Sequence, residues 1–232
     1  MLSFTPFNHR AGSNHTCQPM IAYTIMYDGS KADGEQYVAP FRAIGPAVNI
    51  TTTGIAYKDL YVQGGLGLDG TICRENENIL GFPNGIMSWN GTAMRKAFNL
   101  FAEITADKTF ATSVFLLESY GMKGVHAVDT KSSAVPSGER ENGILVAPIF
   151  WWAGHKEENV QKANKYGEKI RAAVFEGGTA SKGEYHAYVN YATGGETIEE
   201  VYGYEQWRLK KLRALKKAWD PHNQFGFYAP IS

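Results

Sequence analysis

A short run near the C-terminus, EYHAYVNYATGG over residues 184–195, gathers side chains that could do chemistry. It places two phenols and an amide, Tyr188, Asn190 and Tyr191, close together before a Gly-Gly pair. Phenols can transfer protons, and amides can hold a ligand by hydrogen bonds. The run predicts a strand with Tyr188 and Asn190 on one face and Tyr191 on the other. Taken alone, it favours ordinary sheet aromatics with a hydrogen-bonded amide.

Three more polar side chains stand in or beside apolar runs. Glu118 lies in LLESYG, and a carboxylate in an apolar strand is costly to bury unless it is paired. Arg140 is expected to anchor its loop by hydrogen bonds, with substrate contact as the alternative. His186 is expected on the same face as Tyr188, where a hydrogen-bonded sheet histidine is favoured over a proton carrier.

Two other features have a structural and a functional interpretation. Trp151 and Trp152 are expected as one core tryptophan and one at the sheet rim, with stacking on a substrate as the alternative. The basic run RLKKLRALKK could be an anion site. The helical spacing of its apolar residues instead predicts an amphipathic helix with a solvated basic face. These apolar residues are Leu209, Leu212, Leu215 and Trp219.

Composition excludes several classes of protein. The 232 residues are 44% hydrophobic and 20% charged, and 23 basic residues balance 23 acidic ones. A zero net charge argues against a nucleic-acid partner and against an anionic membrane surface. No apolar run approaches the roughly 20 residues of a membrane span. The first residues lack the pattern of a signal peptide, so either the chain is not secreted or its true beginning lies upstream.

The two cysteines, Cys17 and Cys73, match no metal-ligand spacing and cannot form a disulfide framework. Free buried thiols are favoured, with one disulfide as the alternative, and no metal site is expected. Three N-x-[ST] sequons, at Asn14, Asn49 and Asn90, weakly favour a glycosylated, secretory history.

The elements that must position these side chains follow from periodicity and turn residues. Strands are expected over 20–29, 112–121, 143–154 and 184–191, and helices over 33–45, 88–104, 156–175 and 197–219. The strands are too few and irregular for βαβ units, so the fold class is α+β, with an antiparallel sheet covered by helices on one face. GGLGLDG, residues 64–70, is read as a loop and not as a phosphate cradle.

The C-terminal residues carry a family resemblance. YVNY followed by YGYEQWRLKKLRALKKAWDPHNQFGFYAPI resembles the end of a berberine-bridge-enzyme-like FAD-linked oxidase. The matching positions are Tyr188, Asn190, Tyr191, Tyr202, Gly203, Arg208, Leu209, Asp220, Pro221, Asn223, Phe225, Pro230 and Ile231. FRAIGPAV, VFLLESYG and AVPSGERENGILVAPIFWW resemble upstream segments of the family, so the resemblance covers about residues 20–232.

The resemblance implies FAD as cofactor and a small molecule as substrate. It also implies an N-terminal flavin domain with a Gly-Gly-His segment, which this sequence lacks. The chain is therefore expected to be the substrate half, with a substrate domain over 1–183 and a C-terminal segment over 184–232 that would return to a separate FAD domain. Secretion is expected if a signal peptide lies upstream.

The resemblance also implies roles for individual residues. Asn190 and Tyr188 would face the flavin, and Tyr191 would be the base, which needs a lowered pKa. Glu118 would tune Tyr191, contact substrate or form a salt bridge. Some relatives use an acidic residue on the strand after the Arg loop, but residues 144–150 have none, which leaves Tyr191 without that helper.

Two other classes of function fit the same residues. One is a binding module that holds a sugar or phenolic ligand in an aromatic cleft without flavin. The other is an inactive fragment whose exposed cleft wall would aggregate.

Overall fold

A computed structural model describes residues 2–6, 19–63 and 75–231, with the backbone alone at 2–6. Predictions for Cys17, Cys73, Asn14 and the segment 64–70 lie outside these ranges. The chain forms two compact units, Tyr23–Asn76 and the remainder, Met1–Ala22 with Glu77–Ser232. The predicted division at residue 183 is not one of these boundaries and stays a functional proposal.

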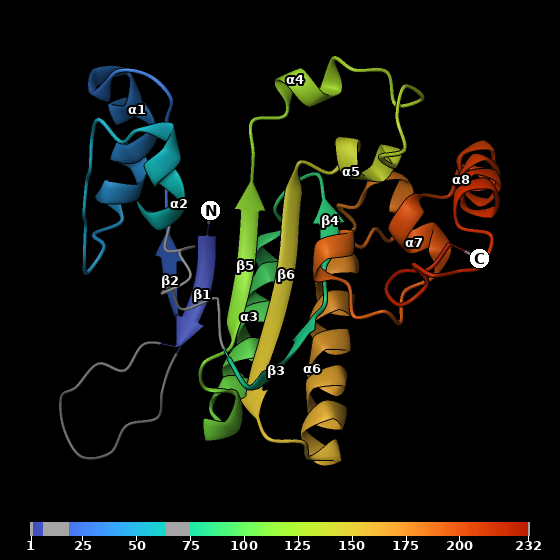
Figure 1. The fold of residues 1–232 in the computed structure, drawn as a ribbon. Helices are drawn as coiled ribbons and strands as arrows, with labels where there is room; N and C mark the ends of the chain where they lie inside the picture. Colours follow the sequence, from blue (N-terminus) through green and yellow to red (C-terminus); the bar gives the residue numbers. More distant parts are fainter. Residues whose placement is uncertain (1, 7–18, 64–74, 232) are drawn as a thin grey trace. The chain divides into compact units, whose positions relative to one another are not determined.

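The larger unit is built on an antiparallel sheet (Figure 1). The strands are β1 (Leu2–Pro6), β2 (Pro19–Tyr23), β3 (Glu77–Gly81), β4 (Asn84–Ile86), β5 (Val114–Ser119) and β6 (Ile144–Ala153). Their order is β2-β1-β5-β6-β3, and β4 pairs with β6 beside β3. β5 and β6 were both predicted from their apolar runs, and they pair with Glu118 opposite Leu145.

Helices α3 (Gly91–Thr105) and α6 (Glu157–Phe175) lie together against one face of this sheet (Figure 1). Their predicted apolar faces are confirmed, since Phe101, Ile104 and Ile170 are fully buried in the core. Residues Phe115, Leu117, Val146, Phe150 and Trp152 enter the same core from β5 and β6. Because strand side chains alternate, Glu118 and Leu145 point to the opposite face.

The first turn of α3 explains one sequon. The Asn90 Oδ1 atom accepts a hydrogen bond from the Ala93 N–H at 3.1 Å, which caps the helix. Its Nδ2 atom donates to the Gly177 carbonyl at 3.1 Å and so ties α3 to the end of α6. The amide that a glycan would occupy is therefore already used in holding two helices together.

The C-terminal region departs from prediction in two places. Residues 184–191 form no strand: an extended stretch ends in a 3-10 turn, Val189–Tyr191. The single helix expected over 197–219 is two helices, α7 (Ile198–Tyr202) and α8 (Gln206–Trp219). Gly203 separates them with φ 93°, a conformation that favours glycine.

Short elements connect these parts. Helices α4 (Lys123–His126) and α5 (Ser137–Glu141) lie between β5 and β6 in the sequence. One 3-10 turn, Lys108–Phe110, lies between α3 and β5, and another, Ser181–Gly183, follows α6. The smaller unit contains α1 (Lys31–Ala43), a 3-10 turn at Tyr57–Asp59 and α2 (Leu60–Gln63). Helix α1 confirms the prediction for 33–45. None of the helices in the described ranges is long and apolar enough to cross a bilayer.

Candidate functional site

Glu118 is the buried carboxyl of the sheet face that lies away from α3 and α6. Glu118 lies near the end of β5 and is only 7% exposed. Burial raises the pKa of Glu118, because a charged carboxylate loses solvation, while hydrogen bonds from Tyr120 and Tyr191 act in the opposite direction. The predicted salt bridge is not among its contacts in the described residues. Its contacts are with phenols.

The turn at Val189–Tyr191 brings the three predicted residues together. The Tyr191 N–H donates to the Tyr188 carbonyl at 2.9 Å, which closes the turn. The rings of Tyr188 and Tyr191 meet edge to face at 5.5 Å. The Asn190 Nδ2 atom donates to the Tyr188 hydroxyl at 2.9 Å. The strand-like separation of faces expected for these residues is therefore wrong, since a turn places both rings in contact.

Tyr191 reaches the sheet at Glu118. Its hydroxyl donates to Glu118 Oε2 at 3.4 Å, longer than the roughly 2.7 Å of an ideal O–H···O bond. The two residues are 73 positions apart in the sequence. The contact therefore joins the two residues that the family resemblance names as catalytic candidates. The roles assigned to them stay predictions.

Sequence reasoning missed Tyr120 as a third phenol. Burial and the neighbouring Glu118 carboxylate raise the pKa of Tyr120 to about 12. The sequence could have predicted this neighbour, because Tyr120 follows Glu118 by two positions and side chains two positions apart in an extended chain point to the same face.

The pKa of Tyr191 is shifted against expectation. Burial raises the pKa of Tyr191, and the charge of Glu118 and the nearby phenols of Tyr120 and Tyr188 raise it further. A base was expected to have a lowered pKa. The structure shows a phenol that stays protonated and donates its proton toward a carboxylate.

Asn190 and Tyr188 are the residues that the resemblance assigns to a flavin. Asn190 is exposed on the outer side of the turn, and Tyr188 is half-buried. An amide and a hydroxyl suit the polar edge of an isoalloxazine ring, which offers both donors and acceptors. These groups fit the ring edge of FAD. They do not form a phosphate cradle, so the rest of the cofactor would need residues elsewhere.

Predictions for the neighbouring side chains have mixed outcomes. Arg140 does anchor its loop, through a 2.8 Å hydrogen bond from Nη2 to the Ser133 hydroxyl. Trp151 and Trp152 are both buried, so the expected rim position is wrong. β6 pairs with β5, β3 and β4, and successive residues of β6 from Val146 to Trp152 are buried.

His186 lies outside the strands, and its carbonyl accepts a hydrogen bond from the Gly85 N–H at 3.2 Å. It is 2% exposed, its two ring nitrogens have no hydrogen-bond partner in the described residues, and its ring meets Tyr204 edge to face at 5.6 Å. Glu184 Oε2 lies 3.7 Å from Nε2. Burial lowers the pKa of His186, so the ring is held neutral.

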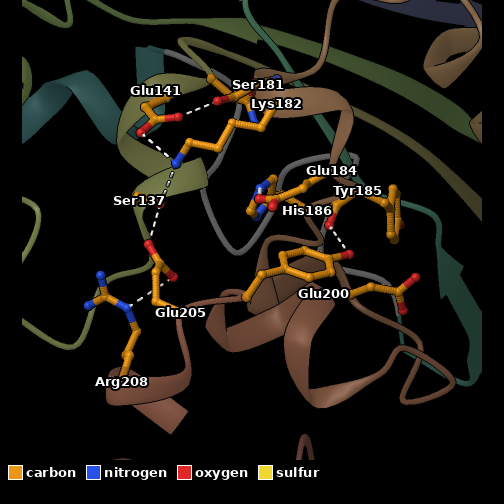
Figure 2. Close-up of polar contacts among 12 residues, drawn as sticks. Ser137, Glu141, Ser181, Lys182, Glu184, Tyr185, His186, Glu200, Glu205 and Arg208 are labelled. Carbon is orange, nitrogen blue, oxygen red and sulfur yellow. Dashed lines mark hydrogen bonds and ion pairs between the residues drawn. The ribbon is translucent and has the colours of Figure 1, made fainter.

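A polar network fixes the segment that leads to the turn (Figure 2). Lys182 Nζ lies 3.2 Å from Glu141 Oε1 and 3.4 Å from the Ser137 hydroxyl. Ser137 in turn donates to Glu205, just before α8. The network therefore joins α5, residues 181–182 and the α7–α8 junction.

Arg208 extends this network to the loop before α5. It is 1% exposed and donates to the carbonyls of Thr130 at 3.0 Å and Ser133 at 2.5 Å. Its Nε atom lies 3.5 Å from Glu205 Oε2 (Figure 2). The basic run of α8 thus has one buried member, which binds backbone carbonyls and the Glu205 carboxylate of this chain, while the expected solvated face holds for exposed members such as Lys210 and Lys211.

Two surface hollows lie apart from the Glu118–Tyr191 contact. One, of about 450 Å³, is lined by residues including Asp107, Lys156 and Lys162. The other, of about 330 Å³, lies between Ala192, Tyr202 and Pro230. Neither of these two hollows is lined by Glu118 or Tyr191, although the second reaches Ala192, the residue after Tyr191.

Comparison with known proteins adds independent observations. Residues 187–232 match the family model described as berberine and berberine like. An FAD-linked oxidoreductase of Gibberella zeae is 34% identical over 216 residues, which cover 92% of this chain and 42% of that protein. An FAD-linked oxidoreductase of Penicillium roqueforti is 32% identical over 225 residues, 92% of this chain and 41% of its own length. The chain thus spans less than half of these relatives.

Solved structures share the fold at low sequence identity. A carbohydrate oxidase from Microdochium nivale, in complex with a substrate analogue, aligns with a TM-score of 0.65 and 17% identity, over 99% of this chain and 48% of that one. A chitooligosaccharide oxidase aligns with a TM-score of 0.64 and 15% identity, over 89% of this chain and 44% of that one. At these identities the likeness concerns the fold alone.

Proposed function

Because the chain belongs to the berberine-bridge-enzyme-like family of FAD-linked oxidoreductases, we propose that its 232 residues supply the substrate half of such an enzyme. The observation that carries the proposal is the contact between the Tyr191 hydroxyl and the buried Glu118 carboxyl. The flavin domain would come from residues outside this sequence. The substrate would be a small organic molecule or a sugar with an oxidisable C–H next to an O–H or N–H.

Bound FAD would supply the hydride acceptor, which no side chain can replace. The residues of this chain would do the rest. Asn190 and Tyr188 would meet the ring edge and set the distance between ring and substrate. Tyr191 would take the proton from the substrate's O–H or N–H group as the hydride leaves the adjacent C–H.

The raised pKa of Tyr191 is compatible with this role if Glu118 shares the proton. Tyr191 would accept the substrate proton at its hydroxyl oxygen while its own proton passes to Glu118 Oε2. A free phenolate then never forms, and the elevated pKa of Glu118 makes the carboxylate a better proton acceptor. Glu118 on β5 would thereby act as the acidic helper that β6 lacks.

The length of the Tyr191–Glu118 contact suits a site that tightens on binding. Catalytic hydrogen bonds are often long without substrate and shorten in the reactive complex. A substrate hydroxyl bound beside Tyr191 would press the phenol toward Glu118. The phenol of Tyr120, on the same carboxylate, would keep the carboxylate oriented.

Substitution of Tyr191 by phenylalanine tests the proposal in the complete, flavin-loaded protein. We expect the rate of anaerobic flavin reduction by substrate to fall by about 10²-fold or more, the size of a typical acid–base contribution. Substrate affinity should change little, because only one hydroxyl is lost.

Tyr166→Phe is the matched control, since it removes a hydroxyl that contacts Glu103 on the helix side of the sheet. Its reduction rate should match the unmodified protein. Unchanged reduction in Tyr191→Phe would remove the base assignment. Tight ligand binding by the chain without flavin would favour the binding-module alternative.

A further inference from the structure

The turn that carries Tyr191 is packed directly against the backbone of β3. Gly81 is the last residue of β3 and pairs with Ile149 of β6. A Cβ atom added at Gly81 would lie 2.5 Å from the Tyr191 carbonyl oxygen and 3.4 Å from its carbonyl carbon. These are backbone atoms, so they cannot swing away as a flexible side chain would. Hence only glycine fits here without moving the turn.

The other side of the turn is held by the C-terminal tail. The Tyr228 hydroxyl lies 3.0 Å from the Ala192 carbonyl oxygen and also contacts the carbonyl of Val189. Its single proton is shared between two acceptors that flank Tyr191. These contacts join the tail to Val189, the first residue of the turn, and to Ala192, which follows it, whereas Gly81 meets Tyr191, the last residue of the turn.

We propose that Gly81 and Tyr228 form a clamp that sets the position of Tyr191 relative to Glu118. Both are positioning residues, since neither touches the reacting groups. The inference deepens the proposed function, because the clamp matters for oxidation only if Tyr191 handles the proton. Its geometric content can be tested separately.

The test follows the titration of the Glu118 carboxyl by NMR in the 232-residue chain with isotope-labelled glutamate, the signal being assigned with Glu118→Gln. Loss of the Tyr191 hydrogen bond removes a group that favours the charged carboxylate, so the pKa of Glu118 should rise. Tyr191→Phe measures the full effect of that loss. Gly81→Ala and Tyr228→Phe should each raise the pKa of Glu118 toward the value found in Tyr191→Phe.

Two matched variants control for general damage. Gly91→Ala adds a methyl group where nothing lies within 4 Å, and Tyr166→Phe removes a remote hydroxyl. Both variants should leave the Glu118 titration unchanged. The thermal unfolding midpoint of Tyr228→Phe should also equal that of the unmodified chain, because Tyr228 is 52% exposed. An unchanged or lowered pKa of Glu118 in both Gly81→Ala and Tyr228→Phe would overturn the clamp.

The two proposals fail in different experiments. If the Glu118 titration shifts as expected while Tyr191→Phe leaves flavin reduction intact, the clamp stands and the base assignment fails. If reduction slows in Tyr191→Phe but neither clamp variant moves the titration, the base assignment stands alone. In the complete protein the clamp variants should slow flavin reduction by about tenfold or more at unchanged substrate affinity, as a misplaced reacting group does.

Discussion

Glu118 and Tyr191 are coupled through one proton, and the coupling predicts a pH dependence. The raised pKa of Glu118 means that its carboxylate, the proposed proton acceptor, is lost at a higher pH than for an ordinary glutamate. Flavin reduction in the complete protein should therefore fall as the pH drops through this raised value. Glu118→Gln should reduce the rate by about 10²-fold and remove this acid limb.

Glu103→Gln is the matched control for Glu118→Gln, since Glu103 on α3 accepts a hydrogen bond from Tyr166 on α6 and has no part in the proposed relay. Stopped-flow reduction across the pH range measures both variants. An acid limb that persists in Glu118→Gln would assign the titration to another group.

At the scale of elements, the break between α7 and α8 depends on Gly203. Its backbone has φ 93° and ψ 157°, and an added Cβ would lie 2.8 Å from the Pro136 Cβ atom. Gly203→Ala should lower the free energy of unfolding by roughly 2–3 kcal/mol, from backbone strain together with the clash. Chemical denaturation measures this loss.

Gly178→Ala separates the two causes. Gly178 has φ 71°, but nothing lies within 4 Å of its added Cβ, so only backbone strain of about 1 kcal/mol is expected. Equal losses in both variants would show that the Pro136 contact contributes nothing. A larger loss at Gly203 would show that its own backbone conformation, together with its contacts to Glu205 and Pro136, costs more than the strain at Gly178.

At the scale of the whole molecule, the C-terminal tail is ordered yet apolar and exposed. Asp220 accepts hydrogen bonds from the N–H groups of Gln224 at 2.7 Å and Phe225 at 3.1 Å, which shapes the DPHNQF turn. Trp219, Phe225 and Phe227 are 84%, 82% and 96% exposed. Exposed aromatics on a fixed backbone are typical of a surface that meets a partner.

The purified 232-residue chain should therefore bind the dye ANS and self-associate with rising concentration. Phe225→Ser with Phe227→Ser should reduce both, and should leave the unfolding midpoint nearly unchanged because these rings bury little area. Tyr57→Ser, at a residue 90% exposed in the smaller unit, is the control and should not change either. Sedimentation measures the association, and a monomeric, dye-free parent chain would contradict the prediction.

Features that depend on neighbours along the chain could be predicted from the amino-acid sequence. Apolar residues at helical spacing predicted α3 and α6, and apolar runs bounded by turns predicted β5 and β6. The order and spacing of several short segments, from FRAIGPAV to the C-terminal residues, carried the family resemblance and with it the candidate residues. These patterns depend on residues close together in the sequence, so the elements can be predicted without knowing how they pack.

The contacts of those residues follow from packing between distant segments and could not be predicted. The 184–191 run alternates like a strand, yet it forms no strand and closes into a turn with two rings in contact. The pairing of Tyr191 with Glu118, the raised pKa of both groups and the burial of both tryptophans depend on segments distant in the sequence. Position 81 likewise requires glycine because the Tyr191 carbonyl packs against it, although the two residues are 110 positions apart in the sequence.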